Sequence, residues 1–276
     1  MRFDKKSLTS LIVIFAVLLA LVGVKVFNGD TNENKPASLK APDNDGQLVV
    51  HFLDVGQGDS AFVELPDGQC MLIDASVSSY GDKIVETIEG YGYTEIDYLV
   101  ATHPHADHIG GMTNVVEGFE IGEVYMPKAT STSKTFEGLL TAISDKGLQI
   151  HTAKTGVTIY SDDETEIEIL APVSESYEET NNYSAVVKIT YGSNSFLFTG
   201  DAEELSENEM LDKCYDKLCA DVLKVGHHGS SSSTSDAFLQ AVSPKYAVIS
   251  CGEDNSYGHP HKETISRLND MGIDYY

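Results

Sequence analysis

The sequence has few basic residues. It contains 18 lysines and arginines against 43 aspartates and glutamates, which gives a formal net charge of −25 at pH 7. A field of this sign repels polyanions such as nucleic acids and anionic lipid surfaces. We therefore expect no stable binding of duplex DNA and no purely electrostatic attachment to a membrane.

Cysteine is scarce as well. Cys70, Cys214, Cys219 and Cys251 form no Cys-x-x-Cys pair and are too few for a disulfide framework. We interpret them as small apolar residues of the core. The composition, 41% hydrophobic and 22% charged, is that of an ordinary globular protein, which excludes a disordered chain, a collagen and a long coiled coil.

One long apolar run lies near the N-terminus. Three basic residues precede it, and residues 8–24 are almost wholly apolar. Extended to Phe27, the run has about 20 residues, the minimum for a helix that crosses a bilayer. We predict an uncleaved signal anchor over residues 1–27, a single-pass transmembrane helix that leaves the rest of the chain outside the cytoplasm. A cleaved signal peptide, which would make the protein secreted, is the alternative.

The rest of the chain divides into a linker and one domain. Residues 28–46 are polar, contain two prolines and show no apolar period, and residues 47–276 form the predicted domain. Short β-rich runs separated by glycine-containing turns open this domain, and strands alternate with helices later. This order predicts an α/β (α+β) fold with two sheets packed face to face and helices outside. The expected strands are 48–55, 60–65, 70–75, 96–102, 121–127, 149–153, 166–170, 185–191, 195–200, 221–226 and 245–251, and the expected helices are 80–91, 133–146, 203–217, 236–242 and 261–271.

The strongest local pattern is a cluster of histidines directly after the predicted strand 96–102. Residues 103–108 read HPHADH, so four of the six are potential metal ligands. Imidazole and carboxylate are ligands that zinc and manganese accept. Gly110 and Gly111 follow and let the backbone pass close to its neighbours before a helix begins. The pattern predicts a metal site at the end of a strand.

This motif resembles the signature of the metallo-β-lactamase superfamily, which implies an αββα sandwich with one or two metals at the sheet edges. Three further segments resemble the hydrolase domain of ComEC-type competence proteins, which take part in DNA uptake. They are LDVGQGDS at 53–60, VGHHGS at 225–230 and SYGHPH at 256–261. The resemblance covers residues 47–276. The multi-span channel of full ComEC proteins has no counterpart in this sequence, so transport itself is not implied.

The resemblance implies two divalent ions, zinc or manganese, and a set of residues that hold them. Asp201 follows strand 195–200, where the family has a bridging carboxylate, although it could also cap the helix that follows. His228 is expected to act as a catalytic residue beside Asp107, protonating the leaving group, but the choice between His227 and His228 as ligand stays open. The implied ligands are His103 and His105 for the first ion, Asp107, His108 and His227 for the second, and Asp201 between them.

The sequence departs from the family at one ligand. Most relatives have a further histidine ahead of the bridging aspartate, whereas Asn181, Asn182 or Ser184 stands there in this chain. We predict that Asn182 faces the site, where its amide oxygen would contact substrate or a hard ion such as manganese. A first ion without that histidine would be held loosely.

Several other polar residues are weaker candidates. His259 and His261 are expected to contact a phosphate oxygen of the substrate or to complete the site, and a histidine-rich turn is the equal alternative. Asp59 is expected to orient a ligand histidine, unless it is merely a turn residue. We interpret His51 and His151 as structural, and Tyr80, Tyr183 and Tyr257 as core residues.

The resemblance implies a hydrolase in which a metal-activated hydroxide attacks a phosphodiester of extracellular nucleic acid or of a small molecule. The net charge favours a short or small phosphodiester over a long duplex. Hydrolysis of a phosphorylcholine ester, a lactone or another ester is one alternative, since the fold alone does not choose the substrate. A non-catalytic surface binding module is the other. The oligomeric state does not follow from the sequence.

Overall fold

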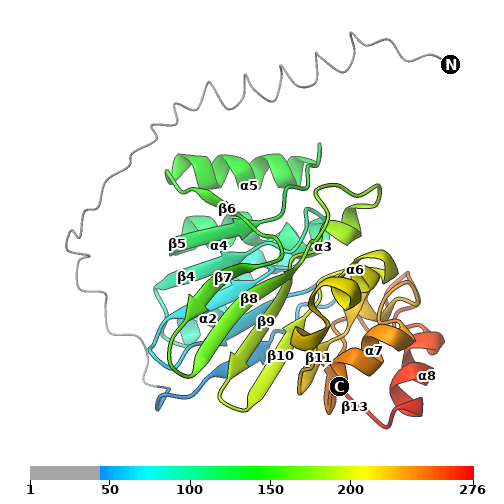
Figure 1. The fold of residues 1–276 in the computed structure, drawn as a ribbon. Coiled ribbons are helices and arrows are strands. Elements are labelled where there is room, and N and C mark those ends of the chain that lie inside the picture. The colour runs from blue at the N-terminus through cyan, green and yellow to red at the C-terminus, as the bar shows by residue number, and fades with distance from the viewer. Residues whose placement is uncertain (1–43) are drawn as a thin grey trace, which may run out of the picture. The chain divides into compact units, whose positions relative to one another are not determined.

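The computed structural model describes residues 44–276, which form two β-sheets with helices on their outer faces (Figure 1). The predicted signal anchor at 1–27 and nearly all of the predicted linker at 28–46 lie outside the described residues. Among residues 44–276, no helix has the length and apolar character needed to cross a bilayer.

The first half of the described chain builds a six-stranded sheet in the order β1-β2-β3-β4-β5-β6. β1 to β3 pair antiparallel through tight turns, and β3 to β6 pair parallel because helices carry the chain back between them. The strands are β1 (Val49–Phe52), β2 (Ala61–Glu64), β3 (Cys70–Ile73), β4 (Glu95–Val100), β5 (Glu120–Met126) and β6 (Ile150–Thr152), and the helices are α2 (Gly81–Gly90), α3 (Ala106–Ile109), α4 (Met112–Gly118) and α5 (Lys134–Asp145).

The second half builds a seven-stranded sheet in the order β13-β12-β11-β10-β9-β8-β7 and repeats this plan. β7 to β10 pair antiparallel, and β10 to β13 pair parallel with a helix between each pair. The strands are β7 (Val157–Ser161), β8 (Thr165–Ala171), β9 (Val186–Tyr191), β10 (Asn194–Phe198), β11 (Val222–Lys224), β12 (Tyr246–Val248) and β13 (Asp274–Tyr275), and the helices are α6 (Glu204–Cys214), α7 (Asp236–Val242) and α8 (Lys262–Asp270).

Side-chain alternation along the strands produces four layers. In β2, Phe62 packs toward the helices of the first sheet, whereas its neighbour Val63 packs between the two sheets. The second sheet does the same, because Leu197 joins the cluster under α6 to α8 while Phe198 faces the other sheet. The expected helix–sheet–sheet–helix arrangement is thus the observed one.

Some observed elements were not among those expected. β7 was not expected, although its sequence VTIYS is rich in β-branched and aromatic residues. The expected helix 133–146 corresponds to α5, whose Phe136, Leu139, Ala142 and Ile143 are buried, whereas Leu140 is 36% exposed.

The parallel strands of both sheets end at a common edge. The first sheet contributes the loops after β3 and β4, and the second contributes the loops after β10, β11 and β12. Hydrogen bonds join the sheets at this edge: the N–H of Ala185 donates to the carbonyl of Thr102 over 2.9 Å, and the N–H of Gly252 donates to the Gln57 side chain over 3.0 Å. Loops from both halves of the chain therefore meet at one place.

Candidate metal centre

The histidine loop after β4 is packed tightly against the loop that follows β3. A Cβ atom on Gly110 would lie 2.4 Å from the backbone nitrogen of Ser78 and 2.6 Å from the carbonyl oxygen of Ser76, so only glycine fits. The N–H of Ala75 donates to the carbonyl of His108 over 2.7 Å. These contacts fix the loop, and short α3 begins within the motif itself.

The loop brings its side chains against Asp201, which follows β10 in the second sheet. Nε2 of His108 lies 3.2 Å from Oδ1 of Asp201, and Nε2 of His103 lies 3.7 Å from Oδ2. Nε2 of His228, from the loop after β11, lies 3.6 Å from Oδ1 of the same carboxylate. Two groups of potential ligand atoms result, each within 4.8 Å: His103, His105 and Asp201 in one, and Asp59, His108, Asp201 and His228 in the other. Asp201 is shared by both.

The donor atoms of this cluster fit a divalent cation. Nε2 of His108, Nε2 of His228 and Oδ1 of Asp201 are buried and have no hydrogen-bond partner among residues 44–276. Buried polar atoms without partners are costly, so native proteins rarely keep them without a bound group. Imidazole nitrogens with carboxylate oxygens are a donor set that zinc and manganese accept.

Polar groups behind the histidines hold the rings in place. Nδ1 of His108 lies 2.7 Å from Oδ2 of Asp74, and Nδ1 of His228 lies 2.9 Å from the carbonyl oxygen of Ser250. An acceptor on Nδ1 requires the proton there, which leaves the lone pair on Nε2 directed at the cluster. Asp74 is a site residue that sequence reasoning missed; its only signal was an aspartate directly after a buried strand, as at Asp201.

The charges of the cluster are strongly coupled. Burial alone would lower the pKa of His108, but Asp201 and Asp74 raise it well above its usual range. The pKa of His228 is likewise raised to about 9 by Asp201 and Asp59 in spite of burial. Burial and the neighbouring His108 instead hold the pKa of His103 well below its usual range. Without a metal, protons on His108 and His228 offset the buried carboxylates.

Comparison with known proteins agrees with this geometry. The family model described as "Metallo-beta-lactamase superfamily" matches residues 53–253. The chain belongs to the metallo-β-lactamase superfamily. It is 32% identical over 236 residues to ComE operon protein 3 of Bacillus subtilis, covering 79% of this chain and 30% of that protein. It is 29% identical over 232 residues to competence protein ComA of Neisseria gonorrhoeae, covering 84% and 31%. The chain thus spans about a third of the length of these curated relatives.

A solved structure supports the fold of the superfamily. The chain matches CmlA, a diiron β-hydroxylase from Streptomyces venezuelae, with a TM-score of 0.55 and 15% identity, over 83% of this chain and 52% of that one. At this identity the likeness concerns the fold alone. A protein with this fold can therefore carry a chemistry other than hydrolysis, and the site has to decide the reaction.

The two adjacent histidines of the second sheet lie differently from the sequence expectation. His228 lies with the ligand atoms of His108 and Asp201 and is 1% exposed. His227 is half-buried at the rim, where Nδ1 lies 3.4 Å from Glu203 and Nε2 lies 3.8 Å from Asp201. Both residues have positive φ, 50° and 55°, so the alternation expected of an extended strand does not hold after β11. The geometry favours His228 as the ligand of this superfamily site and His227 as the group facing solvent.

Asn182 does not lie where it was expected. Its Oδ1 accepts hydrogen bonds from the N–H groups of Glu203 and Ser206 over 3.3 and 3.2 Å, so the side chain serves the start of α6 and not a metal or a substrate. Ser184 lies closer to the centre. Its hydroxyl is 3.3 Å from Nδ1 of His103 and accepts from the N–H of Asp201.

The remaining predicted residues line the rim and the back of the centre. The ring of His259 packs edge-on against His227 at 5.7 Å and His261 at 4.8 Å, and burial lowers the pKa of His259 to about 4. Nδ1 of His261 accepts from the N–H of Ser231 over 3.0 Å. Tyr257 was expected in the core, but it is 64% exposed and stacks on His259.

Asp107 and Asp59 contact opposite nitrogens of His228. Oδ2 of Asp107 lies 3.3 Å from Nε2, on the side of the cluster, and Oδ1 of Asp59 lies 3.2 Å from Nδ1, behind the ring. Burial would raise the pKa of Asp59, but Lys224 and His228 lower it to about 2. Burial would also raise the pKa of Asp107, yet the close contact with His228 holds it far below its usual range.

Proposed function

We propose that this chain is a metal-dependent hydrolase that cleaves phosphodiester bonds in short or small substrates. The observation that carries the proposal is the shared carboxylate of Asp201, which stands between two groups of histidine nitrogens. Two divalent ions, when bound, would supply Lewis acidity toward a phosphoryl oxygen and toward water. A nucleophilic serine or cysteine is not needed for such a reaction.

The position of each residue in the cluster indicates which ion it would bind. His103 and His105 would hold one ion, His108 and His228 the other, and Asp201 would contact both. The first group offers two histidine rings, and the hydroxyl of Ser184 lies 3.3 Å from one of them. With so few strong nitrogen donors, this position would accept manganese as well as zinc.

Two histidines at the rim would serve the leaving group. His227 is half-buried and close to Asp201, and His259 packs beside it with an Nδ1 that has no hydrogen-bond partner among the described residues. The His227 ring would hold a proton at the open side of the cluster and pass it to a departing oxygen, and His259 would hold that ring in place. His261 and Ser231 lie next to them and would bind a phosphate oxygen.

The net charge of the chain and its similarity to known proteins together suggest the substrate. Similarity to ComE operon protein 3 and to the competence protein ComA favours a nucleic acid or a fragment of one. The net charge of −25 opposes binding of a long duplex. We therefore propose single-stranded oligonucleotides or dinucleotides as substrates, with no stable binding of duplex DNA.

We also propose that the reaction takes place outside the cytoplasm. The apolar run at 8–24 would hold the chain in the cell membrane, with the hydrolase domain outside the cytoplasm. Protease digestion of intact cells tests this, because an external domain is degraded while a cytoplasmic marker survives. Survival of the domain alongside the marker would contradict the location without bearing on the chemistry.

The chemistry is tested with the full chain purified without chelator. The substrates are bis(p-nitrophenyl) phosphate, a dinucleotide, a short single strand of DNA, a DNA duplex and the carboxylic ester p-nitrophenyl butyrate. We expect hydrolysis of the first three, loss of activity with EDTA and recovery with zinc or manganese. Asp201→Asn should be inactive, and His151→Ala, far from the centre, should be active. Hydrolysis of the carboxylic ester alone, or activity that resists EDTA, would overturn the proposal.

A further inference from the structure

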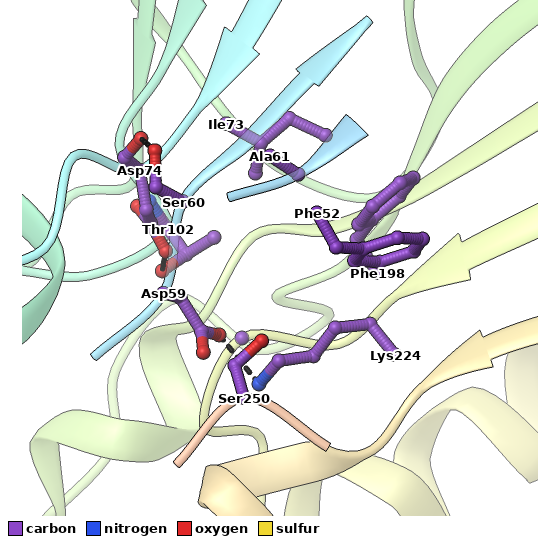
Figure 2. Close-up of a pocket in the computed structure, with 11 residues that line it drawn as sticks. Phe52, Asp59, Ser60, Ala61, Ile73, Asp74, Thr102, Phe198, Lys224 and Ser250 are labelled. Carbon is purple, nitrogen blue, oxygen red and sulfur yellow. Dashed lines mark hydrogen bonds and ion pairs between the residues drawn. The ribbon is translucent and has the colours of Figure 1, made fainter. Parts of the chain in front are cut away.

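A buried ammonium group lies directly behind the metal centre. Lys224 ends β11, is 3% exposed and reaches across to the loop between β1 and β2, as Figure 2 shows. Its Nζ lies 2.5 Å from Oδ2 of Asp59. The pair spans the two sheets, because Asp59 belongs to the first and Lys224 to the second.

The surroundings of the pair are apolar on one side. Phe52 and Phe198 stack at 5.6 Å on the wall of the small cavity that Lys224 also lines. Within the described part of the chain, Nζ of Lys224 has no hydrogen-bond partner apart from this ion pair. A buried charge without its partner is strongly unfavourable, so Lys224 and Asp59 each require the other.

The second oxygen of Asp59 faces a ligand. Oδ1 of Asp59 lies 3.2 Å from Nδ1 of His228, a nitrogen that also lies 2.9 Å from the carbonyl oxygen of Ser250, and Nε2 of the same ring points to Asp201. Asp59 could in principle be a metal ligand itself, since its carboxylate belongs to the same group of donor atoms. However, it faces the Nδ1 side of both His228 and His108, at 3.9 Å from the latter, and its Oδ2 is held by Lys224. Asp59 therefore lies behind both rings, where it supports their orientation and does not itself bind the ion.

We propose that Lys224 is a positioning residue of the metal centre: it holds Asp59 against Nδ1 of His228 and thereby directs Nε2 of His228 at the bound ion. The inference rests on the proposed function only in that a divalent ion binds beside His228. A carboxylate on the far nitrogen of a metal-bound histidine fixes the ring and raises its basicity. Lys224 keeps that carboxylate in place from the opposite sheet.

The test measures metal affinity instead of turnover. Zinc affinity of the full chain is determined by competition with a chromophoric chelator, and the visible spectrum of the cobalt-loaded protein reports the geometry of the site. Lys224→Met should weaken binding about 10–100-fold and alter the cobalt spectrum. Lys224→Arg, which keeps the charge, should recover most of the affinity.

A double variant separates positioning from simple bracing of the two sheets. Asp59→Asn combined with Lys224→Met removes both charges, so the melting temperature without metal should rise above that of Lys224→Met alone. Under the proposal its zinc affinity stays low, because no carboxylate faces His228. Affinity restored to the wild-type value would overturn the proposal.

Lys188→Met is the matched control. Lys188 is a second buried lysine of the same sheet, on β9, and donates to the carbonyl of Cys219 away from the centre. Its loss should lower the melting temperature without changing the affinity for zinc. Unchanged affinity in Lys224→Met together with tight binding by the wild type would overturn this inference alone, whereas absence of metal binding by the wild type would overturn the proposed function.

Discussion

Oδ2 of Asp74 lies 2.7 Å from Nδ1 of His108, and the same carboxylate accepts hydrogen bonds from the N–H and the hydroxyl of Thr102 over 2.8 and 2.6 Å. One buried aspartate at the end of β3 thus fixes both the start of the histidine loop after β4 and the orientation of a ring within it. The loop is stabilised from the neighbouring strand, so the site depends on the register of β3 with β4.

Asp74→Asn should weaken zinc binding about 10–100-fold, because an amide accepts less strongly from Nδ1 of His108. The backbone of Asp74 has φ 58°, which asparagine tolerates, so the loop should persist. Chelator competition measures the affinity. Asp221→Asn is the control, since that carboxylate binds Ser195 and Lys245 far from the centre. Equal affinity in Asp74→Asn and wild type would contradict the role given to Asp74.

His105→Ala should remove one ion and abolish phosphodiester hydrolysis while leaving the fold intact. His105 is exposed, so its truncation should change the free energy of unfolding by about 0.5 kcal/mol or less. Elemental mass spectrometry gives the metal content and circular dichroism the melting curve. His151→Ala removes another exposed histidine and should keep both metal and activity. Full activity of the His105→Ala variant would contradict the metal-dependent mechanism.

The adjacent histidines of the second sheet should differ in their effects. His228→Ala should lose bound metal, because His228 is buried among the ligand atoms. His227→Ala should keep its metal but lower the turnover rate about 10²–10⁴-fold if His227 transfers a proton. Metal content and turnover are measured on the same preparations. The opposite pattern, with metal lost in His227→Ala alone, would restore the assignment expected from the sequence.

Zinc should stabilise the protein more as the pH rises. In the metal-free protein the pKa of His228 is raised from 6.5 to about 9, so this group contributes stability that is complete below pH 6.5 and is lost as the pH rises through 9. A metal ion must displace that proton, so its apparent affinity increases over the same range. The zinc-induced rise in melting temperature should therefore grow between pH 6.5 and 9. A shift independent of pH would contradict the assignment of His228 as a ligand.

The sequence predicted much of the fold and part of the site. Alternation and turn residues located most strands to within a few residues, because a strand with one face on each core must carry apolar residues in a regular pattern. The histidine motif was recognisable because His103, His105 and His108 lie within six residues of one another on one loop. Both the strands and the histidine motif are recognised from residues that lie close together in the sequence.

The remaining site residues followed from contacts between distant segments. Asp74 and Lys224 become neighbours of ligands only when β3 pairs with β4 and when the two sheets stack. Asn182 was expected to face the site and contact substrate or an ion, but its amide oxygen accepts hydrogen bonds from N–H groups at the start of α6. Spacing in the sequence does not predict these contacts, since each depends on which group of a distant segment lies nearby in the folded chain.

The sequence by itself indicated the superfamily motif, the four-layer fold and the histidine loop that joins the cluster, because these depend on short-range patterns. Only the tertiary structure decided which of His227 and His228 faces the centre and which groups hold the ligand rings. The physical reason is that two successive residues of positive φ reverse the side-chain alternation after β11, and that the supporting charges lie on opposite sheets.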